Sequence, residues 1–425
     1  MKHPMHFKRW IIWSLAVLFY FYEYFLRVAP SVMVDELRTA FNIGAGAFGT
    51  MVAFYLYAYA PMQLPVGLLM DRFGARKLLT LATIGCGLAS LLFGFSSHLF
   101  LADFSRLIMG AGSAFAFIGM VYITSHWFSG KTLALLVGIG NSIGMFGAVF
   151  GQGPLSSIVK VISWRPTMVL LGLVGLLLGV IIYLAVRNDP SSKKEKKVRS
   201  SSSSSLFKHL KIVGCNSQTW INGIVALCFY TATVAYGGLW AIPFLTKAHN
   251  MTNSEASYAS SMIYIGWIIA GPIIGYFSDK LCNRKIFIII LTFLSIIFFL
   301  LINYLVPLPK IVVFSLMLIL GICLSGQLLC YSLSIELNPR KSKGTALALT
   351  NCLVFLGGSF IQTLIGWLLD FNWQGVVENG IRIYSYQNFQ TSLLPFPIAF
   401  AIAFVFAFFI KEPSKSRHKH ESFQT

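Results

Sequence analysis

The sequence predicts an all-α membrane protein in which twelve transmembrane helices form two pseudo-symmetric bundles of six. Composition, the spacing of apolar runs and an internal repeat support this prediction. Only 11% of the 425 residues are charged and 56% are hydrophobic, whereas about 25% of the residues of a soluble protein are charged. The chain therefore has too little charge to cover a soluble surface, and a water-soluble enzyme is excluded. The seven cysteines form no CxxC pair, so we expect neither a disulfide framework nor a zinc site.

Apolar runs define the predicted spans, because a transmembrane helix needs about 20 mostly apolar residues. The runs cover residues 10–29, 47–70, 78–99, 101–124, 132–153, 166–186, 219–245, 256–277, 285–305, 309–333, 345–369 and 391–411. The first run follows Lys8 and Arg9 but lacks a small-residue cleavage pattern. We therefore interpret it as a retained span and not as a signal peptide.

Basic residues set the predicted orientation, because short basic loops stay in the cytoplasm. Of the 33 Lys and Arg residues, 25 fall in the segments on the side of the amino terminus and 6 fall in the opposite loops. We therefore expect both termini in the cytoplasm and the protein in a bacterial inner membrane. The net charge of +19 reflects this topology. Nucleic-acid binding is not expected, because it needs a basic face on a soluble surface.

The chain divides near its middle at a basic, serine-rich segment. Residues 187–211 carry eight Lys and Arg and include six consecutive serines, 200–205. Such a segment cannot bury a core and is typical of a flexible tether; the alternative is a polybasic strip that contacts anionic lipid. The predicted units are a bundle over 1–186, a linker over 187–218, a bundle over 219–411 and a cytoplasmic tail over 412–425.

The two halves repeat one another. Residues 67–77 (GLLMDRFGARK) follow the second span, and residues 275–285 (GYFSDKLCNRK) follow the eighth, 208 positions later. A second repeated pattern lies in spans 5 and 11, where Asn141, Gly147 and Gln152 recur 210 positions later as Asn351, Gly357 and Gln362. Parallel repeats of this kind place a binding site between the two halves.

The loop over residues 67–77 resembles the signature of the major facilitator superfamily, G-x-L-x-D-R-x-G-R-R/K. The second copy departs from it at Phe277 and Cys282, so we expect a looser turn there. Residues 106–112 (RLIMGAG) are also similar to the family's R-x-x-Q-G-x-G, except for Met109. The resemblance covers essentially the whole chain. It implies a secondary transporter whose spans 1, 4, 7 and 10 line a central cavity.

Charged residues of the repeated loop are candidates for a gate. Asp71 ends a helix at the cytoplasmic interface beside basic residues, and a charged latch of this kind can stabilise one gate state. The alternative is interfacial snorkelling with compensation of helix-end charge. The candidate gating residues are Gly67, Asp71, Arg72, Gly74 and Arg76 in the first half, and Asp279, Arg284 and Glu336 in the second.

Three charged residues within predicted spans are candidates for function. Glu23 and Arg27 are four residues apart and share one face of span 1 with Tyr20 and Tyr24, and Arg106 lies at a similar depth in span 4. Ionisable residues inside a span are costly and indicate function. One Glu and two Arg leave a net positive site that suits a carboxylate or phosphate, and protonation of Glu23 would change its charge by one unit.

Structural roles are the alternatives for these charges. Arg106 can pair with Asp103, Arg27 can reach the outer headgroups, and Glu23 can serve only as a partner of Arg27. Other polar residues at helical spacing are candidate cargo contacts, although such residues also bridge helices. These candidates are Tyr55 and Tyr59 in span 2, Asn141 and Gln152 in span 5, Thr233, Tyr236 and Trp240 in span 7, Gln327 and Tyr331 in span 10, and Asn351 and Gln362 in span 11.

These features predict a monomeric secondary transporter of a small polar or anionic solute, with protons as the coupling ion and no cofactor or metal. No Walker loop is present, so ATP is not the expected energy source. Uptake is favoured over efflux, because Gly153-Pro154 is followed by Leu-Ser-Ser and not by the glycines of efflux members. Residues 21–30 (FYEYFLRVAP) also resemble bacterial relatives of lysosomal dipeptide carriers, which makes amino acids, dipeptides and organic acids the first cargoes to test. A membrane sensor without transport activity is the alternative of another class.

Overall fold

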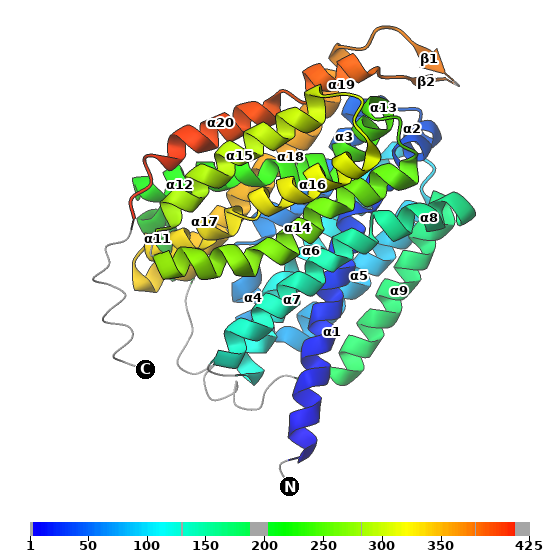
Figure 1. Cartoon of the computed structure of the whole chain (residues 1–425). Coiled ribbons are helices and arrows are strands. Elements are labelled where there is room, and N and C mark those ends of the chain that lie inside the picture. The colour runs from blue at the N-terminus through cyan, green and yellow to red at the C-terminus, as the bar shows by residue number, and fades with distance from the viewer. Residues whose placement is uncertain (1–2, 129–130, 188–202, 282, 379, 413–425) are drawn as a thin grey trace.

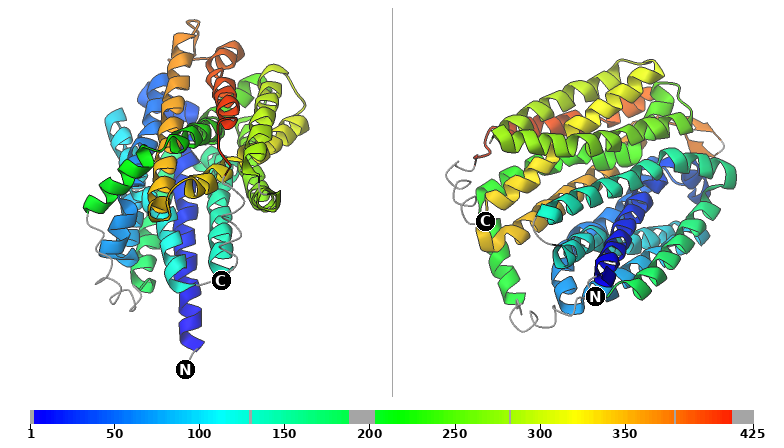
Figure 2. Two further views of the ribbon diagram at one scale, coloured as in Figure 1. Left: turned by 90° about the vertical axis from the view of Figure 1, so that its left-hand side faces the viewer. Right: turned by 60° about the horizontal axis from the view of Figure 1, so that its bottom comes forward.

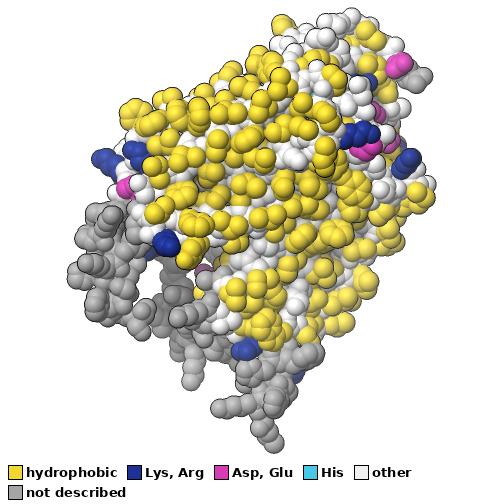
Figure 3. All heavy atoms as spheres, in the orientation of Figure 1, with side chains coloured by type: hydrophobic (Ala, Val, Ile, Leu, Met, Phe, Trp, Pro, Cys, Tyr) yellow, Lys and Arg dark blue, Asp and Glu magenta, His cyan; other side chains and the backbone are white. Residues whose placement is uncertain are grey.

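The computed structural model describes residues 3–128, 131–187, 203–281, 283–378 and 380–412 and is helical almost throughout (Figure 1). Within these residues eleven helices are long and apolar enough to cross a membrane, and up to twelve if a bent pair of helices counts as one span. The predicted class, an all-α multi-pass membrane protein, is confirmed. Hydrophobic side chains cover the middle of the face in Figure 3, and charged side chains gather at its margins.

Two groups of helices correspond to the sequence repeat. We call α1 to α9 the amino-terminal half and α12 to α20 the carboxy-terminal half. The first comprises α1 (His3–Val28), η1 (Ala29–Val32), α2 (Val34–Phe41), α3 (Ala45–Met62), α4 (Val66–Phe73), α5 (Ala75–Phe95), α6 (Leu99–Trp127), α7 (Lys131–Phe150), α8 (Gly153–Ile162) and α9 (Trp164–Ala185).

The second half follows α11 (Ser203–Gly214). It comprises α12 (Ser217–Thr231), η2 (Ala232–Trp240), α13 (Ala241–Ala248), α14 (Asn253–Leu281), α15 (Arg284–Tyr304), α16 (Lys310–Leu324), α17 (Gln327–Glu336), η3 (Arg340–Ser342), α18 (Lys343–Phe371), the hairpin β1 (Val377–Glu378) and β2 (Ile381–Arg382), α19 (Tyr386–Ser392) and α20 (Pro395–Ala407).

The described ends of the chain lie at one end of the molecule, and the β1–β2 hairpin lies at the other (Figure 2). We call these the termini end and the hairpin end. The two halves meet along α3 and α18 and along α14 and α7, which are the main helix contacts between them. Any site between the halves therefore lies beside these four helices.

Several predicted spans are broken, which the apolar runs did not indicate. Span 2, expected as one helix over 47–70, is divided into α3 and α4 by a turn at residues 63–65. Pro65 has no N–H to donate to the carbonyl of Pro61, so Leu64 N bonds that carbonyl instead, at 3.3 Å. Span 7 contains the π-helix η2, span 10 is divided into α16 and α17, and span 5 ends at a break after α7, beyond which the chain continues as α8. The breaks in spans 2, 5 and 7 lie beside the interface between the halves.

Glycines bring helices together at equivalent places in both halves. A Cβ at Gly110 of α6 would stand 1.9 Å from the carbonyl oxygen of Tyr55 in α3, and a Cβ at Gly321 of α16 would stand 2.2 Å from the carbonyl oxygen of Ile263 in α14. No side chain fits at either contact. Tyr55 and Ile263 are 208 positions apart, the offset of the loop repeat, so the sequence duplication is also a duplication of packing.

Part of the predicted linker is helical. Residues Ser203–Gly214, expected within an extended tether, form α11, which packs against α18 and η3. Val213 is buried and the His209 Nδ1 atom lies 2.9 Å from Ser342 Oγ, so this segment has a surface to dock on. Residues 188–202, the tail from 413 onward and Cys282 lie outside the described residues, so the tether, the tail and the looser second turn stay predictions.

Candidate functional site

A buried ion pair lies in α1 at the interface between the halves. The Nη2 atom of Arg27 donates a hydrogen bond to the Oε1 atom of Glu23, which lies one helical turn earlier. The Tyr55 hydroxyl of α3 donates to the same oxygen at 2.7 Å. Glu23 is fully buried and Arg27 is 8% exposed, so both charges are removed from water. The structure thus brings together the charges that the sequence places on one face of span 1.

Aromatic rings enclose the Arg27 guanidinium. Its central carbon lies 4.4 Å from the ring centre of Tyr24, 4.8 Å from that of Tyr59 and 4.9 Å from that of Phe355 in α18. Rings at such distances stabilise a cation through their π faces. The Arg27 Nε and Nη1 atoms and the Glu23 Oε2 atom have no hydrogen-bond partner within the described residues. Arg27 therefore keeps donors that a ligand can use, and it does not reach the headgroups.

Arg106 binds backbone carbonyls and not Asp103. Its Nη1 donates to the carbonyl of Leu26 at 3.0 Å, and its Nη2 lies 3.4 Å from the carbonyls of Arg27 and Val52. Pro30 explains the first contact, because it has no N–H for the carbonyl four residues earlier, that of Leu26. The alternative that Arg106 pairs with Asp103 is therefore wrong. Arg106 joins α6 to α1 and α3 and adds positive charge beside Arg27.

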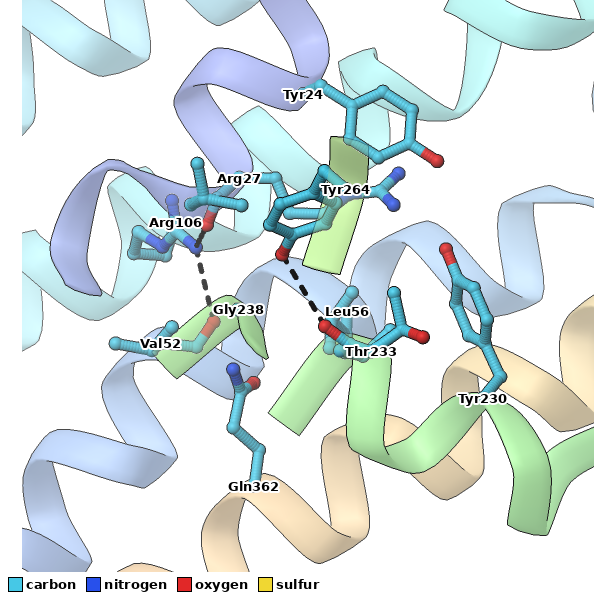
Figure 4. A pocket seen from close by; sticks show the side chains of 12 residues that line it. Tyr24, Arg27, Val52, Leu56, Arg106, Tyr230, Thr233, Gly238, Tyr264 and Gln362 are labelled. Atoms are coloured by element: carbon cyan, nitrogen blue, oxygen red, sulfur yellow. Dashed lines mark hydrogen bonds between the residues drawn. The ribbon is translucent and has the colours of Figure 1, made fainter. Parts of the chain in front are cut away.

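The carboxy-terminal half faces these charges with uncharged polar side chains (Figure 4). The void between the halves is about 10 Å³, roughly the space that one water needs. Tyr230, Thr233, Tyr264 and Gln362 line it opposite Tyr24, Arg27 and Arg106. Of these four, sequence reasoning singled out Thr233 and Gln362 and missed Tyr230 and Tyr264. The available signal for the missed pair was that both are tyrosines inside apolar spans.

The hairpin end is closed by contacts between the halves. The Asp370 carboxylate of α18 accepts hydrogen bonds from the backbone N–H groups of Ala45 and Gly46, at 3.2 and 2.8 Å, at the start of α3. Arg382 at 3.1 Å and the Tyr384 hydroxyl also donate to this carboxylate. Burial raises the pKa of Tyr384 to about 12, so its hydroxyl keeps the proton that it donates at neutral pH. We call these five residues the hairpin clamp.

Side chains nearer the centre also join helices, once across the interface between the halves and twice within a single half. Gln152 Nε2 donates to the carbonyl of Gly237 in η2 at 2.6 Å and to Ser31 Oγ at 3.2 Å. Trp240 Nε1 donates to the backbone carbonyl of Gln362 at 3.0 Å. Two of the predicted site residues, Gln152 and Trp240, thus hold helices together, which is the helix-bridging role that the sequence left open.

The termini end is hollow. A cleft of about 400 Å³ lies between α3, α4, α6 and α18 and is lined by Gly67, Asp71, Phe117, Leu347 and Asn351, among others. At its inner boundary the Asn351 amide donates to Gln63 Oε1 at 2.9 Å and accepts from the Tyr331 hydroxyl at 2.5 Å. The molecule is therefore closed at the hairpin end and open toward the termini end, and Gln63 and Asn351 of this polar chain line the cleft.

Comparison with known proteins agrees with this architecture. The model of the Major Facilitator Superfamily matches residues 13–362 and 227–424. The chain belongs to this superfamily. It is a non-enzymatic transporter, as the sequence predicted.

Individual relatives are named as transporters. The "Uncharacterized transporter YybO" of Bacillus subtilis is 25% identical over 392 residues, which cover 87% of this chain and 89% of that protein. The "Probable sulfoacetate transporter SauU" of Cupriavidus necator is 22% identical and covers 65% of this chain and 66% of its own. The human "Lysosomal dipeptide transporter MFSD1" is 21% identical, covering 85% and 80%. The predicted likeness to the dipeptide group is confirmed.

A solved structure shares the fold. A bacterial homologue of the human lysosomal transporter Spinster, in an inward-facing and occupied conformation, superposes with a TM-score of 0.70. It is 17% identical and covers 96% of this chain and 98% of its own.

The superfamily loop and its repeat take different forms in this transporter. In the first copy Gly74 has a φ of 80°, a value that favours glycine, and Arg76 Nε donates to the carbonyl of Tyr183 at 2.9 Å. Arg72 lies over the ring of Phe73. In the second copy Arg284 bridges Asp279 and Glu336 at 2.9 and 2.8 Å. The structure thus joins all three carboxy-terminal gating candidates in one cluster.

Some predicted site residues lie away from Arg27. Tyr236 packs within the carboxy-terminal half, against Phe299 and Phe396. Tyr20 donates to Asn141 at 3.3 Å within the amino-terminal half. Gln327 is buried at the start of α17 and does not line the central void. The helical period that selected these residues does not show which neighbour a face meets.

Proposed function

We propose that this transporter takes up a small organic monoanion together with a proton, by alternating access. The observation that carries this proposal is the Arg27 guanidinium, which is buried between the halves with Nε and Nη1 unpartnered. A buried donor without an acceptor is costly. A carboxylate, sulfonate or phosphate oxygen from the cargo would relieve that cost.

The charges favour an anion over a zwitterion. Glu23, Arg27 and Arg106 leave one net positive charge at the site. A dipeptide also carries an ammonium group, and the nearest carboxylate, Glu23, already accepts from Arg27 and Tyr55. The name of SauU, a relative, specifies an organic anion. A dipeptide cargo is the second candidate, favoured by the likeness to MFSD1.

The ion pair suggests how a proton is coupled. A proton on Glu23 removes the charge that holds Arg27, and the freed guanidinium can then bind the anion with two parallel donors. Proton and anion therefore favour each other, which is the linkage that symport requires. An efflux antiporter, in which the proton displaces the cargo, is the alternative mode.

The orientation and the domain organisation are part of this proposal. The basic loops support placing the termini end in the cytoplasm, which makes the 400 Å³ cleft an inward-facing path in a bacterial inner membrane. The bundles over 1–186 and 219–411 would then rock as units about the Arg27 site. The cleft loop with Asp71, and the Arg284 cluster, are the proposed inner gates.

Uptake by proteoliposomes with an acidic exterior tests the proposal. We expect wild type to accumulate a labelled organic monoanion such as glycerate, Arg27→Gln to lose at least about 90% of the rate, and Arg27→Lys to recover part of it. Lys160→Gln removes a positive charge from an exposed position at the hairpin end and should behave as wild type. Equal rates for wild type and Arg27→Gln would sink the proposal.

A further inference from the structure

We infer that Gln362, with Thr233 and the tyrosines around it, forms a neutral subsite that selects anions carrying a hydroxyl group. This inference rests on the proposed function and specifies the part of the cargo that lies away from the charge. It assigns the two halves different tasks, because the amino-terminal half would bind the anionic group and the carboxy-terminal half its hydroxylated body.

The first support is the distribution of charge around the void. All charged residues that line it, Arg27 and Arg106, belong to the amino-terminal half. The carboxy-terminal half contributes side chains that are polar but uncharged, namely two tyrosines, a threonine and a glutamine. A cargo with a second charge at its far end would meet no counter-charge among these residues, whereas a hydroxylated end would find donors and acceptors.

Gln362 itself is the second support. Its side chain is 3% exposed, its Oε1 atom is buried without a hydrogen-bond partner, and it points toward the void in Figure 4. Its backbone carbonyl is held by Trp240 Nε1 at 3.0 Å. The residue is therefore positioned while its amide oxygen is unused. A buried acceptor in this condition is costly unless a ligand supplies a donor.

The internal repeat gives a matched comparison. Gln152 occupies the equivalent position 210 residues earlier, and its Nε2 makes two hydrogen bonds, to Gly237 and Ser31. Its Oε1 is also without a partner. The Gln362 side chain, in contrast, makes no hydrogen bond within the described residues. The Gln152 side chain therefore links the two halves, whereas the equivalent Gln362 side chain links no helices in the described part of the chain.

Thr233 supplies a second group of the right kind. Its Oγ1 accepts from Trp267 Nε1 at 3.2 Å, which fixes the side chain and leaves the hydroxyl proton for an acceptor. The carbonyl of the same residue lies 3.4 Å from the Tyr264 hydroxyl. A cargo hydroxyl could thus donate to Gln362 Oε1 and accept from Thr233. Sites built on such pairs reject analogues that lack the hydroxyl, because the protein groups are then left unpaired.

Glycerate and propionate test the inference, because they share a carboxylate and a three-carbon chain and differ in two hydroxyl groups. We would measure their dissociation constants by calorimetry on the purified full-length transporter. For wild type we expect glycerate to bind at least about tenfold more tightly than propionate. Gln362→Leu should weaken glycerate to nearly the affinity of propionate and change propionate less than about twofold.

Two further variants keep the test decisive. Gln152→Leu, the repeat control, should keep the preference for glycerate. Thr233→Val should reduce the preference for glycerate over propionate without abolishing anion binding. This variant tests the same subsite if the Gln362 variant does not fold. A wild type that binds both anions equally, or a Gln362→Leu variant that keeps the full preference, overturns the subsite and leaves the anion carrier standing. A wild type that binds neither anion overturns the proposed function itself.

Discussion

The two halves of the molecule share their packing but not their charges. Gly110 and Gly321 bring equivalent helices into backbone contact, each against a carbonyl of the neighbouring helix. The buried charges Glu23, Arg27 and Arg106 lie in the amino-terminal half, and the residues that face them from the other half are neutral. The difference teaches that the duplication preserved a scaffold while the two inner faces acquired separate chemistry.

The hairpin end shows the same asymmetry. Where α18 meets α3, the Asp370 carboxylate caps the first turn of α3. Where α8 meets α14, the equivalent contact is a hydroxyl pair, Ser156 and Ser254, at 3.0 Å. One interface is therefore held by a charge and the other by a neutral hydrogen bond, so the two should respond differently to substitution.

Breaking the shared scaffold should have the largest effect. Gly110→Leu and Gly321→Leu each place a side chain where a carbonyl oxygen stands 1.9 or 2.2 Å from the added Cβ. Overpacking costs typically about 1–3 kcal/mol and occasionally more, so both variants should lose most of the monodisperse protein in size-exclusion chromatography. Gly67→Leu, where a Cβ meets nothing within 4 Å, is the control for folding. If Gly321→Leu remained monodisperse while Gly110→Leu did not, the two halves would not share this helix packing.

Neutralising Glu23 in the amino-terminal half should have the second largest effect. Glu23→Gln leaves Arg27 without its counter-charge and removes the proposed proton acceptor. We expect uptake that no longer responds to an imposed pH gradient, with at least about a tenfold loss of gradient-driven accumulation. The measurement is labelled-anion uptake with and without the gradient. A gradient response equal to that of wild type would remove Glu23 from the coupling mechanism.

Neutralising the hairpin clamp should shift the conformation and leave the fold intact. Asp370→Asn removes a charge that binds two backbone donors of α3. Hydrogen bonds to charged groups contribute about 1.5–3 kcal/mol, so the population that is open at the hairpin end should rise roughly tenfold or more. Spin labels at the exposed residues 39 and 387, in a cysteine-free background, would report longer distances at the hairpin end.

A matched control sharpens that comparison. Ser156→Ala, at the neutral interface, should change the label distances less than Asp370→Asn does, because a neutral hydrogen bond contributes about 1 kcal/mol. If the two variants open the hairpin end equally, the charged cap is not the dominant contact.

The Arg284 cluster should have the smallest effect. Asp279 is 67% exposed, whereas Arg284 and Glu336 are 13% and 21% exposed; exposed ion pairs contribute up to about 1 kcal/mol, and Arg284→Gln leaves Glu336 at the solvent boundary, where water can reach it. Arg284→Gln should therefore change the maximal uptake rate less than about fivefold. Uptake kinetics at saturating cargo check this, with Lys310→Gln, which breaks the exposed pair with Glu255, as the comparison. A complete loss of uptake in Arg284→Gln would make this cluster an essential gate.

Local sequence signals were enough for the membrane fold, the repeat and the Glu23–Arg27 pair. Apolar length predicts spans, and a spacing of four predicts a shared helix face. Contacts between distant residues carried no such signal. Asp370 binds residues more than 320 positions away, and Phe355 reaches Arg27 only because α18 packs on α3. Arg106 was found, but one of its carbonyl partners, that of Leu26, is free only because Pro30 in another helix has no N–H to bond it.

Calorimetric titration of a small hydroxylated monoanion into wild type and Arg27→Gln tests the central claim most directly. Repeating the titration in buffers of different ionisation enthalpy also counts the protons taken up. We expect wild type to bind with close to one proton per anion and Arg27→Gln to show no measurable binding. Equal affinity in both proteins, or binding by wild type without proton uptake, would contradict an anion site coupled to the Glu23–Arg27 pair.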